Sequence, residues 1–166
     1  AGTGGVSLSS NLTSTGNDDI EITGPVTLAG PVTIQTAGAA GDDIQIDGTV
    51  DGAQPLAFVA GSGDASLNGV IGSNAAIDSL SVAAANIALE AIGAAGEGVS
   101  GITSIVGTTS ITFNGLIYRA NQQTYSSLVK TLSSGLTQFI ASDDSVSLLG
   151  GTTDLTLSTG LGVQTG

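Results

Sequence analysis

A short strand-like motif recurs along this chain at a nearly constant spacing. The motif begins with an acidic pair, continues with a branched apolar, a polar and a second branched apolar residue, and ends with another polar residue and a glycine. It is clearest at 18–26 and 42–50. Copies of its core follow at 65–69, 87–91, 111–115 and 146–150. The central apolar residues of successive copies are 24, 21, 22, 24 and 35 residues apart. Periods of this length are typical of solenoids, in which each repeat buries its apolar face only against its neighbours.

The alternation inside each copy predicts strands, because successive side chains of a strand point to opposite faces. One inward column then contains Ile20, Ile44, Ala65, Ile87, Ile111 and Val146, and the next contains Ile22, Ile46, Leu67, Leu89, Phe113 and Leu148. A column of small residues marks a corner at Gly24, Gly48, Gly69, Ala91, Gly115 and Gly150. Beyond that corner we expect an apolar column of Val26, Val50, Ile71 and Ile117, with Gly93 and Thr152 as exceptions.

Two more alternating stretches, 26–28 and 32–34, follow Gly-Pro turns within the first full copy. Three short strands in about 24 residues describe one coil of a parallel β-helix. We therefore expect one all-β domain over 1–166, a right-handed parallel β-helix (β-solenoid) of about seven short coils. The 35-residue interval predicts a fifth coil with about ten extra residues in a loop around 118–125.

A helix over 82–95 is the alternative for the most Ala-rich region, since alanine has the highest helix propensity. The fit of Ile87 and Leu89 to the columns, and the glycines that follow, favour strand instead. The same region is interrupted by Asn86, Glu90 and Gly93, so we expect no membrane insertion.

Charge and composition restrict the partners. Two basic residues against 14 acidic ones give a net charge of −12, which opposes nucleic acid and anionic membranes and favours solubility and divalent cations. The absence of cysteine excludes disulfides and thiolate metal sites. The chain begins at Ala1 without a methionine or an apolar leader, so we read it as mature, with any export signal already removed.

Three segments, Ile111–Gly115, Gln123–Tyr125 and Leu128–Lys130, follow one another along the chain. They resemble the apolar-Thr-Phe-Asn-Gly core, the Gln-Thr-Tyr segment and the apolar-Thr-Leu strand in the repeats of filamentous-haemagglutinin-like and other large bacterial surface adhesins. The stretch 42–72 is similar to such repeats as well. The resemblance implies a secreted or surface-anchored β-solenoid with a structural or adhesive role and no catalytic residues.

Catalysis has little support in the residues. Without His or Cys, the common nucleophile–base pairs are missing. β-Helix enzymes that degrade acidic polysaccharides need Arg or Lys beside carboxylates, and Arg119 and Lys130 are the only basic residues. We expect no enzyme, and a polysaccharide-active β-helix enzyme is the third-ranked alternative.

Five carboxylates are the candidate metal ligands: Asp18, Asp19, Asp42, Asp43 and Asp64. Asp19, Asp43 and Asp64 share one column in successive coils, which lie about 4.8 Å apart. Oxygen ligands at this density suit Ca²⁺, the one cofactor we consider. The alternative is a solvated acidic edge that keeps the surface soluble and discourages lateral association.

The segment from Tyr118 to Tyr125 is the candidate contact site, with Tyr118, Arg119 and Tyr125 as its central residues. Aromatic and basic side chains on a protruding loop bind sugars or a neighbouring subunit well. The alternative is a plain insertion in which Tyr125 packs over the core.

The function we expect is structural: an exported, self-associating β-solenoid subunit or segment of a bacterial surface fibre or adhesin, located outside the cell or on its surface. Its partners would be copies of itself, head to tail, because both 6–8 and 161–163 are strand-like and no amphipathic cap accompanies them. The alternative from another class is a calcium-dependent carbohydrate-binding module that binds surface polysaccharide.

Overall fold

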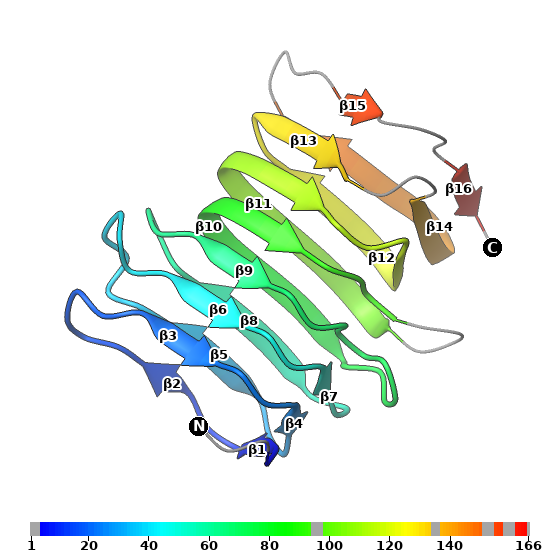
Figure 1. Cartoon of the computed structure of the whole chain (residues 1–166). Helices are drawn as coiled ribbons and strands as arrows, with labels where there is room; N and C mark the ends of the chain where they lie inside the picture. Colours follow the sequence, from blue (N-terminus) through cyan, green and yellow to red (C-terminus); the bar gives the residue numbers. More distant parts are fainter. Residues whose placement is uncertain (1–3, 94–97, 134–136, 151–154, 158–161, 166) are drawn as a thin grey trace.

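The computed structural model describes residues 4–93, 98–133, 137–150, 155–157 and 162–165. It is an all-β, parallel β-solenoid of about six turns. β1 (Val6–Leu8) lies at one end of the stack, and β15 (Leu155–Leu157) and β16 (Gly162–Thr165) lie at the other (Figure 1). The predicted fold class is confirmed, with about six turns in place of about seven.

The remaining strands are β2 (Leu12–Thr13), β3 (Ile20–Ile22), β4 (Val26–Leu28), β5 (Val32–Gln35), β6 (Ile44–Ile46), β7 (Val50–Asp51), β8 (Pro55–Val59), β9 (Ala65–Leu67), β10 (Ser79–Leu89), β11 (Val99–Phe113), β12 (Ile117–Ser126), β13 (Val129–Leu132) and β14 (Gln138–Leu149). The alternative of a helix over 82–95 is wrong for 82–89, which belong to β10, and 94–95 lie outside the described residues. Within the described ranges no helix is long and apolar enough to cross a bilayer.

The turns stack into three faces. Face A contains β3, β6, β9, the ends of β10 and β11, then β13 and β15. Face B contains β1, β4, β7, the bridge residues Ile71 and Ile92, the starts of β12 and β14, and β16. Face C contains β2, β5, β8, the starts of β10 and β11, and the ends of β12 and β14. Every pairing is parallel, as a chain wound in one direction requires.

The predicted inward columns of face A are confirmed for their first five members. The second column of this face runs through Ile22, Ile46, Leu67, Leu89, Phe113 and Leu132, and Leu157 pairs with Leu132 in the strand register. The sixth member is therefore Leu132, and the prediction of Leu148 is wrong. Val146 and Leu148 pair with Gln123 and Tyr125 on face C instead.

The fifth turn is short, not long. It passes from Phe113 to Leu132 in 19 residues, and the predicted loop around 118–125 is strand β12. The copy at 129–132 was missed because its first inward position is occupied by Lys130, which breaks the apolar pattern.

Corners of different length shift the register by one residue on face B. The column after Val50 and Ile71 continues with Ile92 and Tyr118, so the predicted Gly93 and Ile117 are each one residue off. Thr152 lies outside the described residues.

The corner glycines confirm the close stacking of the turns. A Cβ on Gly48 would collide with the carbonyl oxygen of Gly24, and one on Gly69 would collide with that of Gly48. Gly150 does not belong to this column, because it packs against the backbone of Ser127 at another corner.

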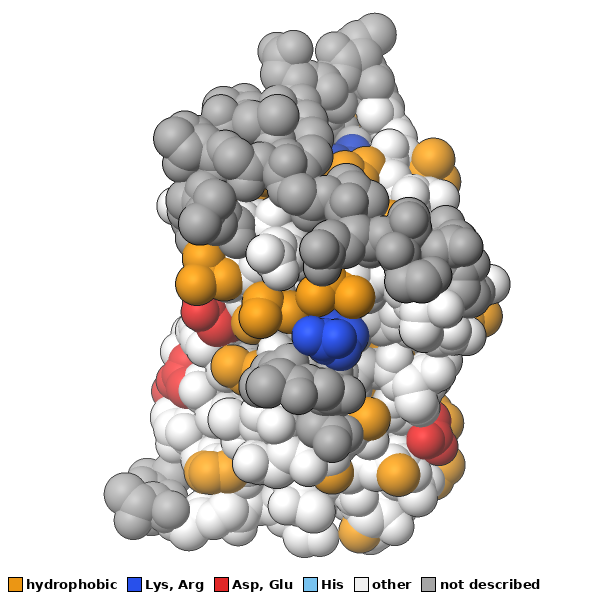
Figure 2. All heavy atoms as spheres, turned by 90° about the vertical axis from the view of Figure 1, so that its right-hand side faces the viewer, with side chains coloured by type: hydrophobic (Ala, Val, Ile, Leu, Met, Phe, Trp, Pro, Cys, Tyr) orange, Lys and Arg blue, Asp and Glu red, His pale blue; other side chains and the backbone are white. Residues whose placement is uncertain are grey.

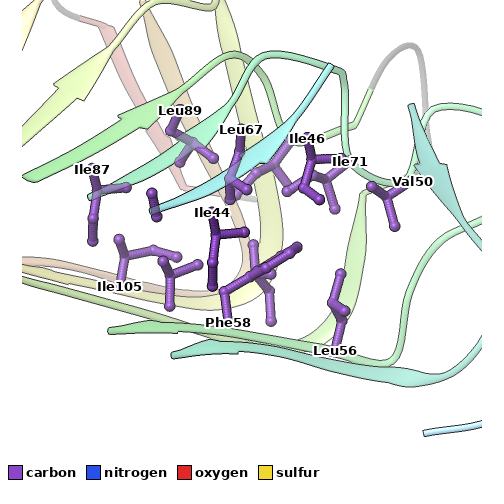
Figure 3. Packing of buried hydrophobic residues seen from close by; sticks show 14 of the residues in the cluster. Ile44, Ile46, Val50, Leu56, Phe58, Leu67, Ile71, Ile87, Leu89 and Ile105 are labelled. Carbon is purple, nitrogen blue, oxygen red and sulfur yellow. The ribbon is translucent and has the colours of Figure 1, made fainter. Parts of the chain in front are cut away.

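The core is a set of thin layers inside the three faces. Ile44 and Leu67 from face A point toward Leu56 and Phe58 from face C (Figure 3). Burying one such side chain contributes about 1.5–3 kcal/mol. The columns therefore supply most of the stability in small, repeated increments.

Replacing Ile46 with aspartate tests this register. The side chain is 1% exposed between Ile22 and Leu67, so Ile46→Asp should lower the free energy of unfolding by more than about 4 kcal/mol. The matched control is Ser81→Asp, which places the same charge on the exposed side of β10. This control should change the free energy of unfolding by no more than about 0.5 kcal/mol. Thermal melts followed by circular dichroism measure both. A folded Ile46→Asp variant with an unchanged melt would show that this position does not face the core.

Candidate functional site

The predicted acidic column forms a hydrogen-bonded ladder. Asp19 Oδ1 accepts the backbone N–H of Asp43 at 2.8 Å, and Asp43 Oδ1 accepts that of Asp64 at 2.7 Å. Asp64 Oδ1 accepts the backbone N–H of Asn86 at 3.0 Å, and Asn86 Oδ1 accepts the hydroxyl of Ser110 at 2.8 Å. We call these five residues the capping column.

The capping column supplies hydrogen-bond acceptors to backbone N–H groups at the start of face A. Each capped N–H lies just before the inward residues of face A, where the hydrogen-bonded ladder begins, and a buried or half-buried N–H without an acceptor is costly. A short side chain from the preceding turn supplies the oxygen in place of a backbone carbonyl. Asn86 continues the column in a different way, because its Oδ1 accepts the Ser110 hydroxyl and not a backbone N–H.

The five predicted calcium ligands are not brought together as one cluster. Asp18 is exposed, whereas Asp42 is 1% exposed and its Oδ2 accepts the Ala39 N–H at 2.9 Å. Across the described residues, no group of three or more acidic, His or Cys side chains has the geometry to hold a metal ion. Calcium binding stays a prediction.

Asp51 carries a second set of cross-turn hydrogen bonds that sequence reasoning missed. Its Oδ1 accepts the backbone N–H groups of Asn74 at 2.7 Å and Ala75 at 3.1 Å, and Ser73 and the Asn74 amide donate to Oδ2. Partial burial acts to raise the pKa of the Asp51 carboxyl, but these hydrogen bonds outweigh it and hold the pKa below its ordinary value. The available signal was the polar Ser73-Asn74 pair one period after Asp51.

The two tyrosines belong to the core, so their prediction as ligand or subunit contacts is wrong. Tyr118 and Tyr125 are fully buried, and the Phe113 ring centroid lies 5.0 Å from each of theirs. The Tyr118 hydroxyl accepts the Gly115 N–H at 2.9 Å and lies 2.9 Å from the Leu89 carbonyl oxygen. Burial raises the pKa of both phenols well above the usual range.

Lys130 is a buried cation that the sequence pattern concealed. Its Nζ donates to the carbonyl oxygens of Ser127 at 2.9 Å and Leu149 at 2.6 Å. The ammonium therefore bonds to the backbone at the C-terminal ends of β12 and β14. Burial lowers the pKa of this ammonium. Its role in the structure is to join backbone segments.

Arg119 is the third predicted contact residue, and it alone of the three reaches the surface. It is half-buried on β12 and borders a hollow of about 270 Å³. The structure therefore separates Arg119 from the two tyrosines with which it was predicted to act.

Comparison with protein-family models, with curated proteins and with solved structures finds no match for this chain. The β-solenoid implied by the resemblance to adhesin repeats is confirmed by the strand pairing, whereas the link to those adhesins stays a prediction.

Two substitutions of Asp43 separate a capping role from a metal-binding role. Asp43→Asn keeps the oxygen and removes a charge that stands between Asp19 and Asp64, so stability should be unchanged or slightly higher. Asp43→Ala removes the acceptor of the Asp64 N–H and should cost about 1 kcal/mol. Hydrogen exchange of the Asp64 amide measures the cap directly: it should accelerate in Asp43→Ala and not in Asp43→Asn.

Equal exchange of the Asp64 amide in the two variants would contradict the capping role. A calcium-dependent rise of the wild-type melting temperature that Asp43→Asn abolishes would establish the metal role instead.

Proposed function

We propose that this protein is a structural β-solenoid that assembles head to tail with other copies of itself, as a subunit or segment of an extracellular, cell-surface fibre or adhesin. The observation that carries the proposal is the open N-terminal turn. Within the described part of the chain, β1, β2 and β3 each pair with a strand on one side only.

The free side of this turn carries unused backbone groups. The Val6 N–H donates to the Pro25 oxygen at 2.7 Å, and the Leu8 oxygen accepts the Ala29 N–H at 2.7 Å, so these two residues bond toward β4. Alternate residues of a parallel strand bond to opposite neighbours. The N–H and C=O of Ser7 therefore face away from β4, toward the open side.

The same alternation applies to β3. Ile20 and Ile22 bond toward β6, through the Asp43 oxygen and the Asp47 N–H, both at 2.9 Å. The N–H and C=O of Glu21 consequently face the open side as well. Exposed edges of this kind pair readily with another strand.

The apolar interior is also less covered at this end. Val6, Leu8 and Leu12 are only half-buried against the core. A further turn stacked on this end would cover them and add apolar burial at about 25 cal/mol per Å².

The capping column gives the stack a direction. Asp19, Asp43 and Asp64 each supply a side-chain oxygen to a backbone N–H of the turn that follows, and Asp19 has no described turn before it to do the same for its own N–H. A turn of the same kind would supply the oxygen, which favours a head-to-tail contact. Contacts of this type are heterologous and produce open filaments when the rotation does not close. Head-to-head pairing is disfavoured, because it would bring the exposed carboxylates of Asp18, Asp19 and Glu21 against their own copies.

The carbohydrate-binding alternative has weaker support. All five aromatic side chains of the chain, Phe58, Phe113, Tyr118, Tyr125 and Phe139, are buried. None of them can stack against a sugar ring, which is the contact that such modules commonly use.

Proline at the open edge tests the assembly. Ser7→Pro removes the N–H that faces the open side and leaves the hydrogen bonds to β4 in place, as proline on edge strands does. Self-association should weaken about tenfold, because roughly one backbone hydrogen bond is lost at each junction. Light scattering over a concentration series measures the mass, and circular dichroism verifies that the turns stay folded.

Ser7→Ala is the matched control, because it keeps the N–H and should associate like the wild type. A wild-type chain that stays monomeric at every concentration, or equal association of the two variants, would contradict the proposal.

A further inference from the structure

We propose that the hollow beside Arg119 is a binding site for a small organic carboxylate, held by the Arg119 guanidinium. The hollow of about 270 Å³ is lined by Gly98, Val99, Ser100, Arg119, Ile140 and Ser142, among others. It lies on the side of the stack, and its lining, which includes Ala76, comes from four successive turns: Ile77 pairs with Val99, Val99 with Ala120, and Arg119 with Ile140. The inference is independent of the assembly at the open turn.

The Arg119 side chain has no partner in the described part of the protein. No oxygen there accepts a hydrogen bond from its guanidinium, and its Nε is buried without an acceptor. The two terminal nitrogens are not among the buried atoms, so a ligand oxygen can reach them and supply the missing acceptor. The other basic residue, Lys130, is already committed to the carbonyl oxygens of Ser127 and Leu149.

Glycine at position 98 lets the neighbouring turn approach Arg119 closely. Its φ is +135°, and a Cβ there would collide with the Arg119 carbonyl oxygen. The turn therefore passes directly against the Arg119 backbone without a side chain of its own.

The chemistry of the hollow selects the ligand. The two terminal nitrogens of a guanidinium form a planar fork that matches the two oxygens of a carboxylate. Val99, Ala120 and Ile140 give the hollow an apolar lining that suits a short aliphatic group. In Figure 2, a group of exposed basic atoms lies next to apolar side chains.

The net negative charge of the protein favours monoanions over dianions as ligands. A protein with a net charge of −12 repels a dianion more strongly than a monoanion. A monocarboxylate with a small branched alkyl group therefore fits better than phosphate. The Ser100 and Ser142 hydroxyls donate to the Ile77 oxygen at 3.2 Å and to Asn121 Oδ1 at 2.8 Å, and neither oxygen accepts a hydrogen bond from the guanidinium.

Saturation-transfer NMR with sodium isobutyrate tests the site, since it observes the ligand and works whatever the size of the assembly. The wild-type chain should give a saturable isobutyrate signal with a dissociation constant on the order of 1 mM, as expected for so few ligand atoms. Isobutyramide has the same shape without the charge and should give no saturable signal. An equal signal from isobutyramide, or phosphate binding as tightly as isobutyrate, would overturn the proposal.

Two variants then assign the signal to the guanidinium. Arg119→Gln should weaken isobutyrate binding at least about tenfold, because it removes both the charge and the fork. Arg119→Lys keeps the charge without the fork, so its affinity for isobutyrate should lie between those of the wild type and Arg119→Gln. Unchanged binding by a folded Arg119→Gln variant would overturn the proposal. If that variant fails to fold, the comparison of isobutyrate with isobutyramide on the wild type decides the question by itself.

Discussion

The backbone hydrogen bonds between successive turns are the interaction on which the rest of this structure depends. The Ile20 N–H donates to the Asp43 oxygen at 2.9 Å, and the Ile44 N–H donates to the Asp64 oxygen at 2.9 Å. This ladder fixes neighbouring turns about 4.8 Å apart. At that spacing the corners admit no Cβ at Gly48 or Gly69, and equivalent side chains are forced into continuous columns.

Because the columns are continuous, each position on a turn is defined by what lies above and below it. Between Ile22 and Leu89 the second inward column of face A is aliphatic, and from Phe113 onward the interior becomes aromatic and partly polar. Two polar side chains of that region pair with each other inside it: the Tyr125 hydroxyl donates to Gln123 Oε1 at 2.8 Å.

The sequence predicts this architecture well where the apolar pattern is unbroken. Five members of each inward column on face A could be placed, because alternation and period were both intact there. The member from the sixth turn could not be placed, because Lys130 occupies an inward position there and finds its acceptors only in the folded chain. One-residue differences in corner length then misplaced Gly93 and Ile117 relative to Ile92 and Tyr118.

The acidic column shows a different limit. Its alignment across turns was predictable, but its role was not. That Asp19 and Asp43 accept backbone N–H groups depends on which way those N–H groups point, and this follows only from the strand register. The unpaired state of Arg119 is likewise a property of its surroundings, since nothing in the local sequence distinguishes it from a solvated surface arginine.

Hydrogen exchange at one pair of equivalent amides tests the central claim, that the open turn is completed by another copy. Glu21 and Gln45 occupy the same position in successive turns, but only Gln45 has a turn on the side that its N–H faces. In dilute protein the Glu21 amide should exchange close to the rate of a free peptide while Gln45 is protected, and at high concentration Glu21 should become protected as well. A Glu21 amide that is protected at all concentrations, or exposed in the assembled state, would contradict the account.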